Sequence, residues 1–344
     1  MYIRFTLLLL LLAGQTIFSL AQSNHPIITS KPIVYHPSLL KWPRDFTPKT
    51  PDLSEPTSNR IYDLHAQVND CSAFDLIVST GGNYHMALTD FWYNDFLKKN
   101  TVQNWYFSTS PPISPEQATN KALSFGNVAL MCAPHVAIGP QDLMDELAEY
   151  NLILGTPQPL FTNRGNVLLV KKGNPKNIKG IEDLAREEVR LATPNPSTEK
   201  RSFSNYARSI YQIVLEAKGE AAAKAFFDKV FNTPTSKWIV GERIHHREVP
   251  HLLFADQADV ALLFYHLARY VQQTFPDEFD IVPLGGTVAQ PDPLPGNVIG
   301  KFYVAKLDVP LTPQQEQIRT AFLTAFLSGT FEDYLKKHFI DPTD

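Results

Sequence analysis

The chain has 344 residues, a formal net charge of −4 at pH 7 and two cysteines. A mildly acidic chain is not typical of a nucleic-acid-binding protein, and it lacks the global positive field that would steer an anion towards it. Any anion site must therefore be local. The length suffices for one large domain or two medium ones, each with an ample core.

The first 21 residues have the features of a cleavable export signal. Arg4 and the α-amine give a positive start, Leu7–Leu12 form an unbroken apolar run, and Ser19-Leu20-Ala21 place small residues at the cleavage position. Polar residues interrupt the second half of this 21-residue segment, whereas a membrane span needs about 20 predominantly apolar residues. We expect cleavage between Ala21 and Gln22, which removes Arg4 and leaves a soluble periplasmic protein.

Residues 22–70 are predicted to form a proline-rich arm. Seven prolines lie between positions 22 and 60. Proline has no backbone N–H to donate to a helix or a sheet, so each one interrupts a candidate element. We expect an irregular segment that packs on the body of the protein only in part.

From Phe74 onward, short apolar runs alternate with amphipathic stretches. Ser114, Pro115 and Gln117 form a capping box at one helix start, and a loop containing Pro134, Gly139 and Pro140 is expected before the next helix. Strands separated by helices predict parallel β-α-β units and hence an α/β fold. The expected strands are 74–80, 104–109, 127–132, 166–173, 189–194 and 258–266; the main helices are 81–100, 141–150, 178–187, 197–219 and 313–337.

Four turns at predicted helix starts are rich in small hydroxyl or other polar residues. Ligands of open α/β sheets bind beyond the carboxyl ends of the strands. Free N–H groups at helix starts can bind an anion there, although each turn alone could equally be an ordinary cap. Tyr265 ends a buried strand and could either close over a ligand or pack in the core. The candidate ligand-binding residues are Ser79, Thr80, Gly81, Ser108, Thr109, Ser110, Ser197, Thr198, His246, Arg247 and Tyr265.

Residues 244–251 (IHHREVPH) contain three histidines and a glutamate, which are common zinc ligands. Their spacing does not match the known zinc-helix motifs, and Pro250 is expected to interrupt any helix that would align them. We therefore expect neither a metal nor a cofactor. A metal-dependent hydrolase is the weaker alternative, because the sequence also lacks the common nucleotide-binding and serine-hydrolase motifs. The sequence thus predicts a protein that is not an enzyme.

Cys71 and Cys132 both lie just outside predicted strands. Export to an oxidising compartment would permit a disulfide between them. Two buried free thiols are the alternative.

Two segments carry a resemblance to the type II periplasmic solute-binding proteins of ABC importers. Residues 160–207, with VLLVKKGNPKNIKGIEDL and ATPNPST, are most similar to the molybdate/tungstate- and sulfate/thiosulfate-binding groups; residues 244–270 resemble the family's return into its first lobe. The resemblance implies two lobes, each a mainly parallel sheet flanked by helices, with a ligand cleft between them. It implies a first lobe of residues 71–163 and 255–344, a second of 164–254, and crossings near 159–166 and 251–258.

The resemblance also implies a function. A monomer would capture a small oxyanion of the molybdate, tungstate or sulfate type, close by hinge motion and dock on an ABC permease in the inner membrane. A secreted ligand-sensing receptor of the same fold is the alternative. Where the sulfate group has glycines, this chain has Glu199, Lys200 and Arg201. Because a carboxylate facing a bound dianion is costly, either Glu199 points away from the ligand with a cation nearby, or the ligand is not sulfate.

Overall fold

The computed structural model describes residues 67–68, 71–108, 113–120, 123–125, 128–232, 238–241 and 244–343. All of them belong to one unit of the chain, Pro48–Asp344. The predicted export signal, the arm apart from Gln67 and Val68, and the candidate residues Thr109 and Ser110 lie outside the described residues.

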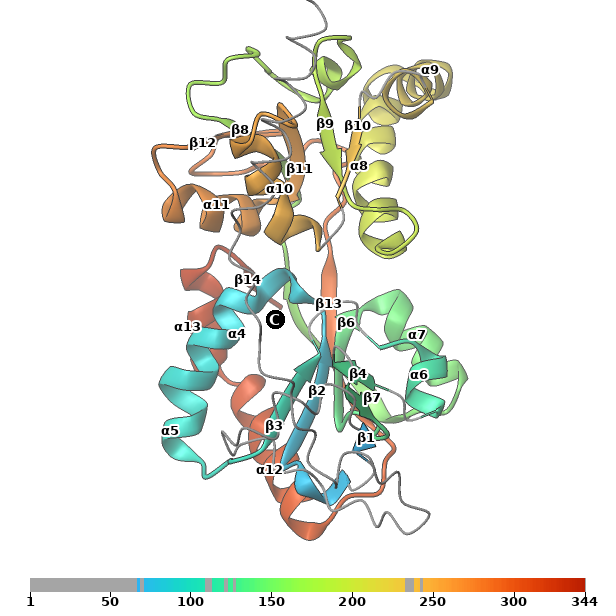
Figure 1. The fold of residues 1–344 in the computed structure, drawn as a ribbon, viewed down its shortest axis with the longest axis vertical. Coiled ribbons are helices and arrows are strands. Elements are labelled where there is room, and N and C mark those ends of the chain that lie inside the picture. The colour runs from blue at the N-terminus through green and yellow to red at the C-terminus, as the bar shows by residue number, and fades with distance from the viewer. Residues whose placement is uncertain are drawn as a thin grey trace, which may run out of the picture. The chain divides into compact units, whose positions relative to one another are not determined.

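The first lobe is built on a six-stranded sheet in the order β14-β7-β13-β6-β2-β3 (Figure 1). β2 is parallel to β3 and β6, and β13 joins β6 in antiparallel orientation. The strands are β2 (Leu76–Thr80), β3 (Trp105–Ser108), β6 (Val136–Pro140), β7 (Ile153–Thr162), β13 (Lys301–Leu307) and β14 (Asp341–Pro342). A separate small sheet contains β1 (Gln67–Val68), β5 (Val128–Leu130) and β4 (Leu123–Phe125).

Helices cover both faces of this sheet because successive side chains of its central strands point to opposite sides. Leu76 and Val78 of β2 pack in one apolar cluster, and Ile77 packs in another. The helical elements are η1 (Cys71–Ala73), η2 (Gly82–Tyr84), α4 (His85–Phe91), a π-helical turn (Trp92–Phe96), α5 (Leu97–Lys99), α6 (Pro115–Thr119), α7 (Gln141–Glu149), α12 (Pro313–Phe326) and α13 (Gly329–Lys337).

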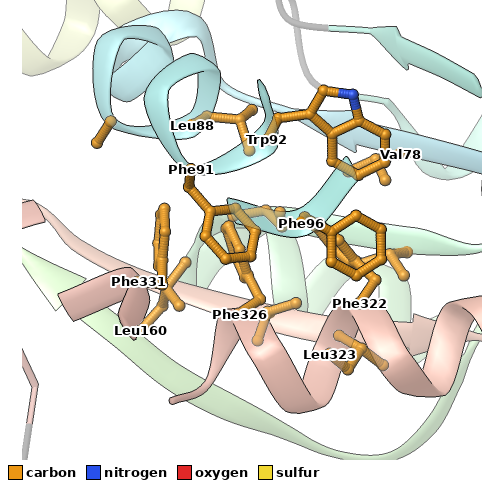
Figure 2. Packing of buried hydrophobic residues seen from close by; sticks show 14 of the residues in the cluster. Val78, Leu88, Phe91, Trp92, Phe96, Leu160, Phe322, Leu323, Phe326 and Phe331 are labelled. Carbon is orange, nitrogen blue, oxygen red and sulfur yellow. The ribbon is translucent and has the colours of Figure 1, made fainter. Parts of the chain in front are cut away.

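The larger of these clusters is aromatic (Figure 2). Phe91 lies with its ring 5.1 Å from Phe331 and 5.8 Å from Phe326, and Phe96 meets Phe322 edge to face at 5.7 Å. These rings fix α4 and its π-helical continuation against α12 and α13. His85, the first residue of α4, and Asn83 in the preceding η2 are thereby held in place relative to the sheet.

The second lobe is built on a five-stranded sheet in the order β10-β9-β11-β8-β12. Its strands are β8 (Asn166–Lys171), β9 (Leu191–Thr193), β10 (Trp238–Val240), β11 (Val260–Phe264) and β12 (Phe279–Val282). α8 (Lys200–Lys218), α9 (Glu220–Phe231) and the 3-10 helix η4 (Ile181–Ala185) cover one face; α10 (His245–Phe254) and α11 (Tyr265–Thr274) cover the other (Figure 1).

The α/β fold class is confirmed, and both sheets are mixed rather than mainly parallel. β8 runs antiparallel to β11 and β12, and β13 runs antiparallel to β6 and β7. β8 is the first strand after the chain enters the second lobe, and β13 is the first strand after it returns to the first lobe. Both run against the β-α-β strands beside them.

The predicted return into the first lobe near 251–258 is wrong. β11 pairs with β8 and β9, and β12 pairs with β8, so both strands belong to the second sheet. The chain leaves the second sheet after Val282 and enters the first at Lys301. The outward passage, between Thr162 and Asn166, falls inside the predicted segment 159–166.

Three local predictions also need correction. The loop expected around Pro134–Pro140 contains the buried strand β6, whose Gly139 and Pro140 come at its end. Pro250 lies inside α10, which persists because buried Val249, Leu252 and Leu253 anchor it on the sheet. The last helix is divided at Leu327–Ser328 into α12 and α13.

Cys71 and Cys132 form a disulfide with a sequence separation of 61. The bond joins η1 to the segment that leads into β6, next to the apolar cluster under α7. It therefore closes a long loop at the base of the first lobe.

Replacing both cysteines by serine should lower the free energy of unfolding by about 4 kcal/mol, because the unfolded chain regains the freedom of that loop. Urea unfolding of the oxidised protein and of the double variant measures the difference. Reductant should destabilise the wild type alone. Equal stability of the oxidised wild type and the double variant would contradict the prediction.

Candidate ligand-binding site

The end of β2 supplies three candidate residues, and two of their hydroxyls already have partners inside the first lobe. Ser79 is buried, and its Oγ accepts the Ile113 N–H at 2.8 Å. The Thr80 hydroxyl is hydrogen-bonded to the Tyr84 hydroxyl. Gly81 is extended and precedes η2. Both hydroxyls thus shape the turn at the end of this strand.

Ser108 and Asn83 flank this turn. Ser108 ends β3 and lies in register beside Ser79, and it is half-buried. Asn83 lies two residues after Gly81, and its side-chain Oδ1 is buried without a partner among the described residues. A buried amide oxygen without a donor is costly unless something else supplies one. Asn83 lies in the same strand-to-helix turn as the candidates Ser79, Thr80 and Gly81, but it is not among the residues that the sequence analysis selects.

The turn between β9 and α8 does not use the predicted hydroxyls as caps. Ser197 and Thr198 are exposed, and the Ser197 N–H donates to Asn195 Oδ1 at 2.9 Å. Helix α8 begins at Lys200, with Glu199 preceding it. The Glu199 carboxylate accepts the backbone N–H of His245, the first residue of α10, at 3.0 Å. This contact brings the starts of α8 and α10 together.

Arg201, which also lies at this helix start, is paired with the first lobe and does not pair with Glu199. Its guanidinium spans to the first lobe, where it binds Asp142 at 2.6 Å and Glu146 at 2.5 Å on α7. Arg201 therefore ties the second lobe to the first instead of compensating Glu199.

Helix α10 presents three successive residues in different surroundings. His245 is buried; its Nε2 is 3.0 Å from the Leu262 carbonyl oxygen, and burial lowers its pKa to about 4. His246 stacks on His85 of the first lobe with ring centroids 5.6 Å apart, and its Nε2 is buried without a partner among the described residues. Arg247 is exposed. Of these three, His246 faces the other lobe.

Tyr265 and His266 open α11 and are both buried. The Tyr265 hydroxyl donates to the Val288 carbonyl at 2.7 Å, so this phenol is fixed within the second lobe. His266 Nε2 instead lies 2.6 Å from the backbone carbonyl of Asn83 in the first lobe, and its Nδ1 has no partner within the described part of the chain. At the end of β11, His266 and not the predicted Tyr265 makes the contact between the lobes.

Asn83, His85, His246 and His266 thus meet where the two lobes touch, and we call them the histidine junction. Burial is the main reason that the pKa of His246 falls to about 3 and that of His266 to about 4. The pKa of His85 is also lowered, again mainly by burial. The three imidazoles are therefore neutral at pH 7. Within the described ranges, no group of side chains has the arrangement of a metal site.

The backbone segments that cross between the lobes are bonded to each other. Asn163 Oδ1 accepts the N–H groups of Gly165 and Gly300, each at 3.0 Å. Asn297 binds the backbone N–H and carbonyl of Asn166, both at 2.9 Å. The sequence reasoning missed these asparagines, because their role depends on two segments more than 130 positions apart.

Residues 133–312 match the family model of bacterial extracellular solute-binding proteins. The chain belongs to this family. A thiosulfate-binding protein of Pseudomonas aeruginosa is 34% identical over 71 residues, which is 21% of each chain. The solute-binding protein thus matches only about a fifth of that relative's length.

Solved structures share the fold at low identity. The sulfate-binding protein SubI from Mycobacterium tuberculosis H37Rv aligns with a TM-score of 0.56 and 15% identity over 81% of this chain and 88% of its own. Iron-bound HitA from Pseudomonas aeruginosa aligns with a TM-score of 0.50 and 13% identity over 76% of this chain and 84% of its own. The predicted two-lobed fold and family are confirmed. No helix in the described residues is long and apolar enough to cross a membrane.

The neutral histidines should make stability fall in acid. A folded-state pKa below the unfolded value means that the unfolded chain binds more protons, so stability is full above pH 6.5 and is lost towards pH 4. His266→Gln should remove up to about 1.4 kcal/mol per pH unit from this slope. Denaturant unfolding between pH 4 and 8 tests this, with exposed His251→Gln as the control; an unchanged slope in His266→Gln would contradict it.

Proposed function

We propose that this solute-binding protein captures a small oxyanion in the periplasm and delivers it to an ABC permease, without chemistry on the ligand. The observation that carries the proposal is the histidine junction, where both lobes contribute buried polar atoms that have no partner among the described residues. Family membership and the likeness to a sulfate-binding fold support the same class of function. The export signal and a monomeric state are part of this proposal.

The ligand contacts proposed here come from both lobes. The side-chain Nδ2–H of Asn83 and the backbone N–H groups at the start of η2 belong to the first lobe, and the ring N–H of His246 belongs to the second. His266 donates its Nε2–H to the Asn83 carbonyl, so its Nδ1 can only accept a proton that the ligand carries. Ser79 keeps its own hydroxyl proton to donate, although its oxygen accepts the Ile113 N–H. Ser197, at the turn before α8, is the outer candidate. Neutral donors fixed by the fold bind an oxyanion by replacing its hydration shell.

Closure of the lobes would hold the ligand. Contacts between the lobes, such as His85 on His246 and Arg201 on α7, exist only while the lobes are together. A ligand that adds further contacts across the same junction shifts the population towards the closed form. The closed form is then the state that a permease would recognise.

Thermal unfolding against a panel of oxyanions tests the proposed function. Sulfate, thiosulfate, molybdate, tungstate and phosphate should include at least one anion that stabilises the mature protein, by about 2.7 kcal/mol at a hundredfold excess over its Kd. His246→Ala should abolish the shift, and His251→Ala, exposed on the same helix, should retain it. No shift with any anion, or an undiminished shift in His246→Ala, would contradict the proposal.

Arg201 should affect affinity without touching the ligand. Arg201 makes two ion pairs. Exposed pairs contribute about 0.2–1 kcal/mol each, so Arg201→Ala should weaken binding by about two- to thirtyfold. Titration calorimetry in low and high salt measures this, and the loss should shrink in high salt. Arg208→Ala, exposed on the same helix, is the control. Combining Arg201→Asp with Asp142→Arg should recover part of the affinity; failure to recover any would argue against an ion-pair role.

A further inference from the structure

The carboxylate of Glu199 lies where two helices begin. It directly precedes α8, and it accepts the backbone N–H of His245 at the first position of α10. The first N–H groups of a helix have no partner within the helix, and they carry part of its positive end. The Glu199 carboxylate therefore already binds one of the N–H groups with which the N-terminus of α10 could bind an anionic ligand.

This carboxylate is kept in a partly buried setting. Burial raises the pKa of Glu199, and the nearby charge of Glu248 acts in the same direction, while the bond from the His245 N–H opposes both. Arg201, two positions further on, has its guanidinium on Asp142 and Glu146 of the other lobe. Arg201 therefore does not neutralise the negative charge of the Glu199 carboxylate.

His246 follows His245 on α10 and stacks on His85 in the histidine junction. Other acceptors, at this junction and on α8, have no donor among the described residues. The side-chain oxygens of Asn83 and of Asn205, on α8, are buried and unpartnered. His266, which is 0% exposed, also has a free Nδ1 beside Asn83. Amide and carboxylate oxygens only accept hydrogen bonds. A fully deprotonated sulfate or molybdate offers no proton to them, whereas an oxyanion with an O–H group does.

We propose that Glu199 is a specificity-determining residue, which selects an oxyanion that still carries a proton at neutral pH, with the chemistry of hydrogen phosphate, over fully deprotonated dianions. The inference rests on the proposed oxyanion-binding function and narrows its ligand class. A protonated oxygen donates a charge-assisted hydrogen bond to the carboxylate. A bare dianion at the same distance is repelled by it, and each buried acceptor left without a donor adds to the cost.

Titration calorimetry with phosphate and with sulfate at pH 7 tests the inference in the full mature protein. The wild type should bind phosphate at least tenfold more tightly than sulfate. In Glu199→Gln, which keeps an oxygen for the His245 N–H and adds a donor, the ratio should fall at least tenfold, mainly because sulfate binds more tightly. Glu216→Gln removes a carboxylate from the exposed side of the same helix and should leave the ratio unchanged.

The outcomes separate this inference from the function on which it rests. If the wild type binds sulfate as tightly as phosphate, or if Glu199→Gln leaves the ratio unchanged while binding persists, Glu199 does not set the specificity. If neither anion binds to the wild type or to the variant, and both proteins melt cooperatively, the inference falls. The oxyanion function itself is contradicted only if thiosulfate, molybdate and tungstate also fail to bind.

Discussion

The two connections between the sheets constrain everything else in the molecule. The chain passes to the second sheet after Thr162 and returns before Lys301, and asparagine side chains bond the two passing segments to each other. Gly165 has a positive φ of 71°, and a Cβ at that position would lie 3.1 Å from Asn297. The connection therefore permits little change in sequence, and it determines which strand ends and helix starts face one another across the lobes.

Each lobe has its own sheet and its own apolar core on either side of these connections. In the second lobe, Leu168 and Leu262 pack under α8, while Leu169 and Leu263 pack under α10 and α11. Because alternate residues of the same strands serve opposite faces, the strands are apolar throughout. This is why the short runs around β2, β8 and β11 were predictable from sequence, as were the capping box at Ser114 and the family resemblance.

Other features depended on contacts that no local pattern reveals. β6 ends in Gly-Pro, which favours a loop, yet its position between β2 and β13 makes it a central strand. Pro250 is normally a helix breaker, but the apolar residues around it hold α10 on the sheet. The boundary between the lobes was misplaced because β11 is a buried apolar strand that could serve either sheet, and only its pairing with β8 decides.

The candidate site was likewise predictable from local sequence only in part. Sequence reasoning located the turns that follow β2 and β9, since helix starts after strand ends are recognisable from Gly, Ser, Thr and Asn. It did not identify which side chains lack partners: Thr80 is bonded to Tyr84 and Tyr265 to Val288, whereas Asn83 and His266 meet across the lobes. Whether a polar group is already satisfied is a property of the folded chain, and in this protein it separates structural residues from proposed ligand contacts.

The central claim is that a solute is held between two lobes that close on it. Electron–electron distance measurements between spin labels at Lys98, on the first lobe, and Gln273, on the second, test it most directly, since both positions are exposed. Addition of the oxyanion found to bind should shorten the mean distance and narrow its distribution. A distribution that is the same with and without saturating ligand would contradict capture by closure.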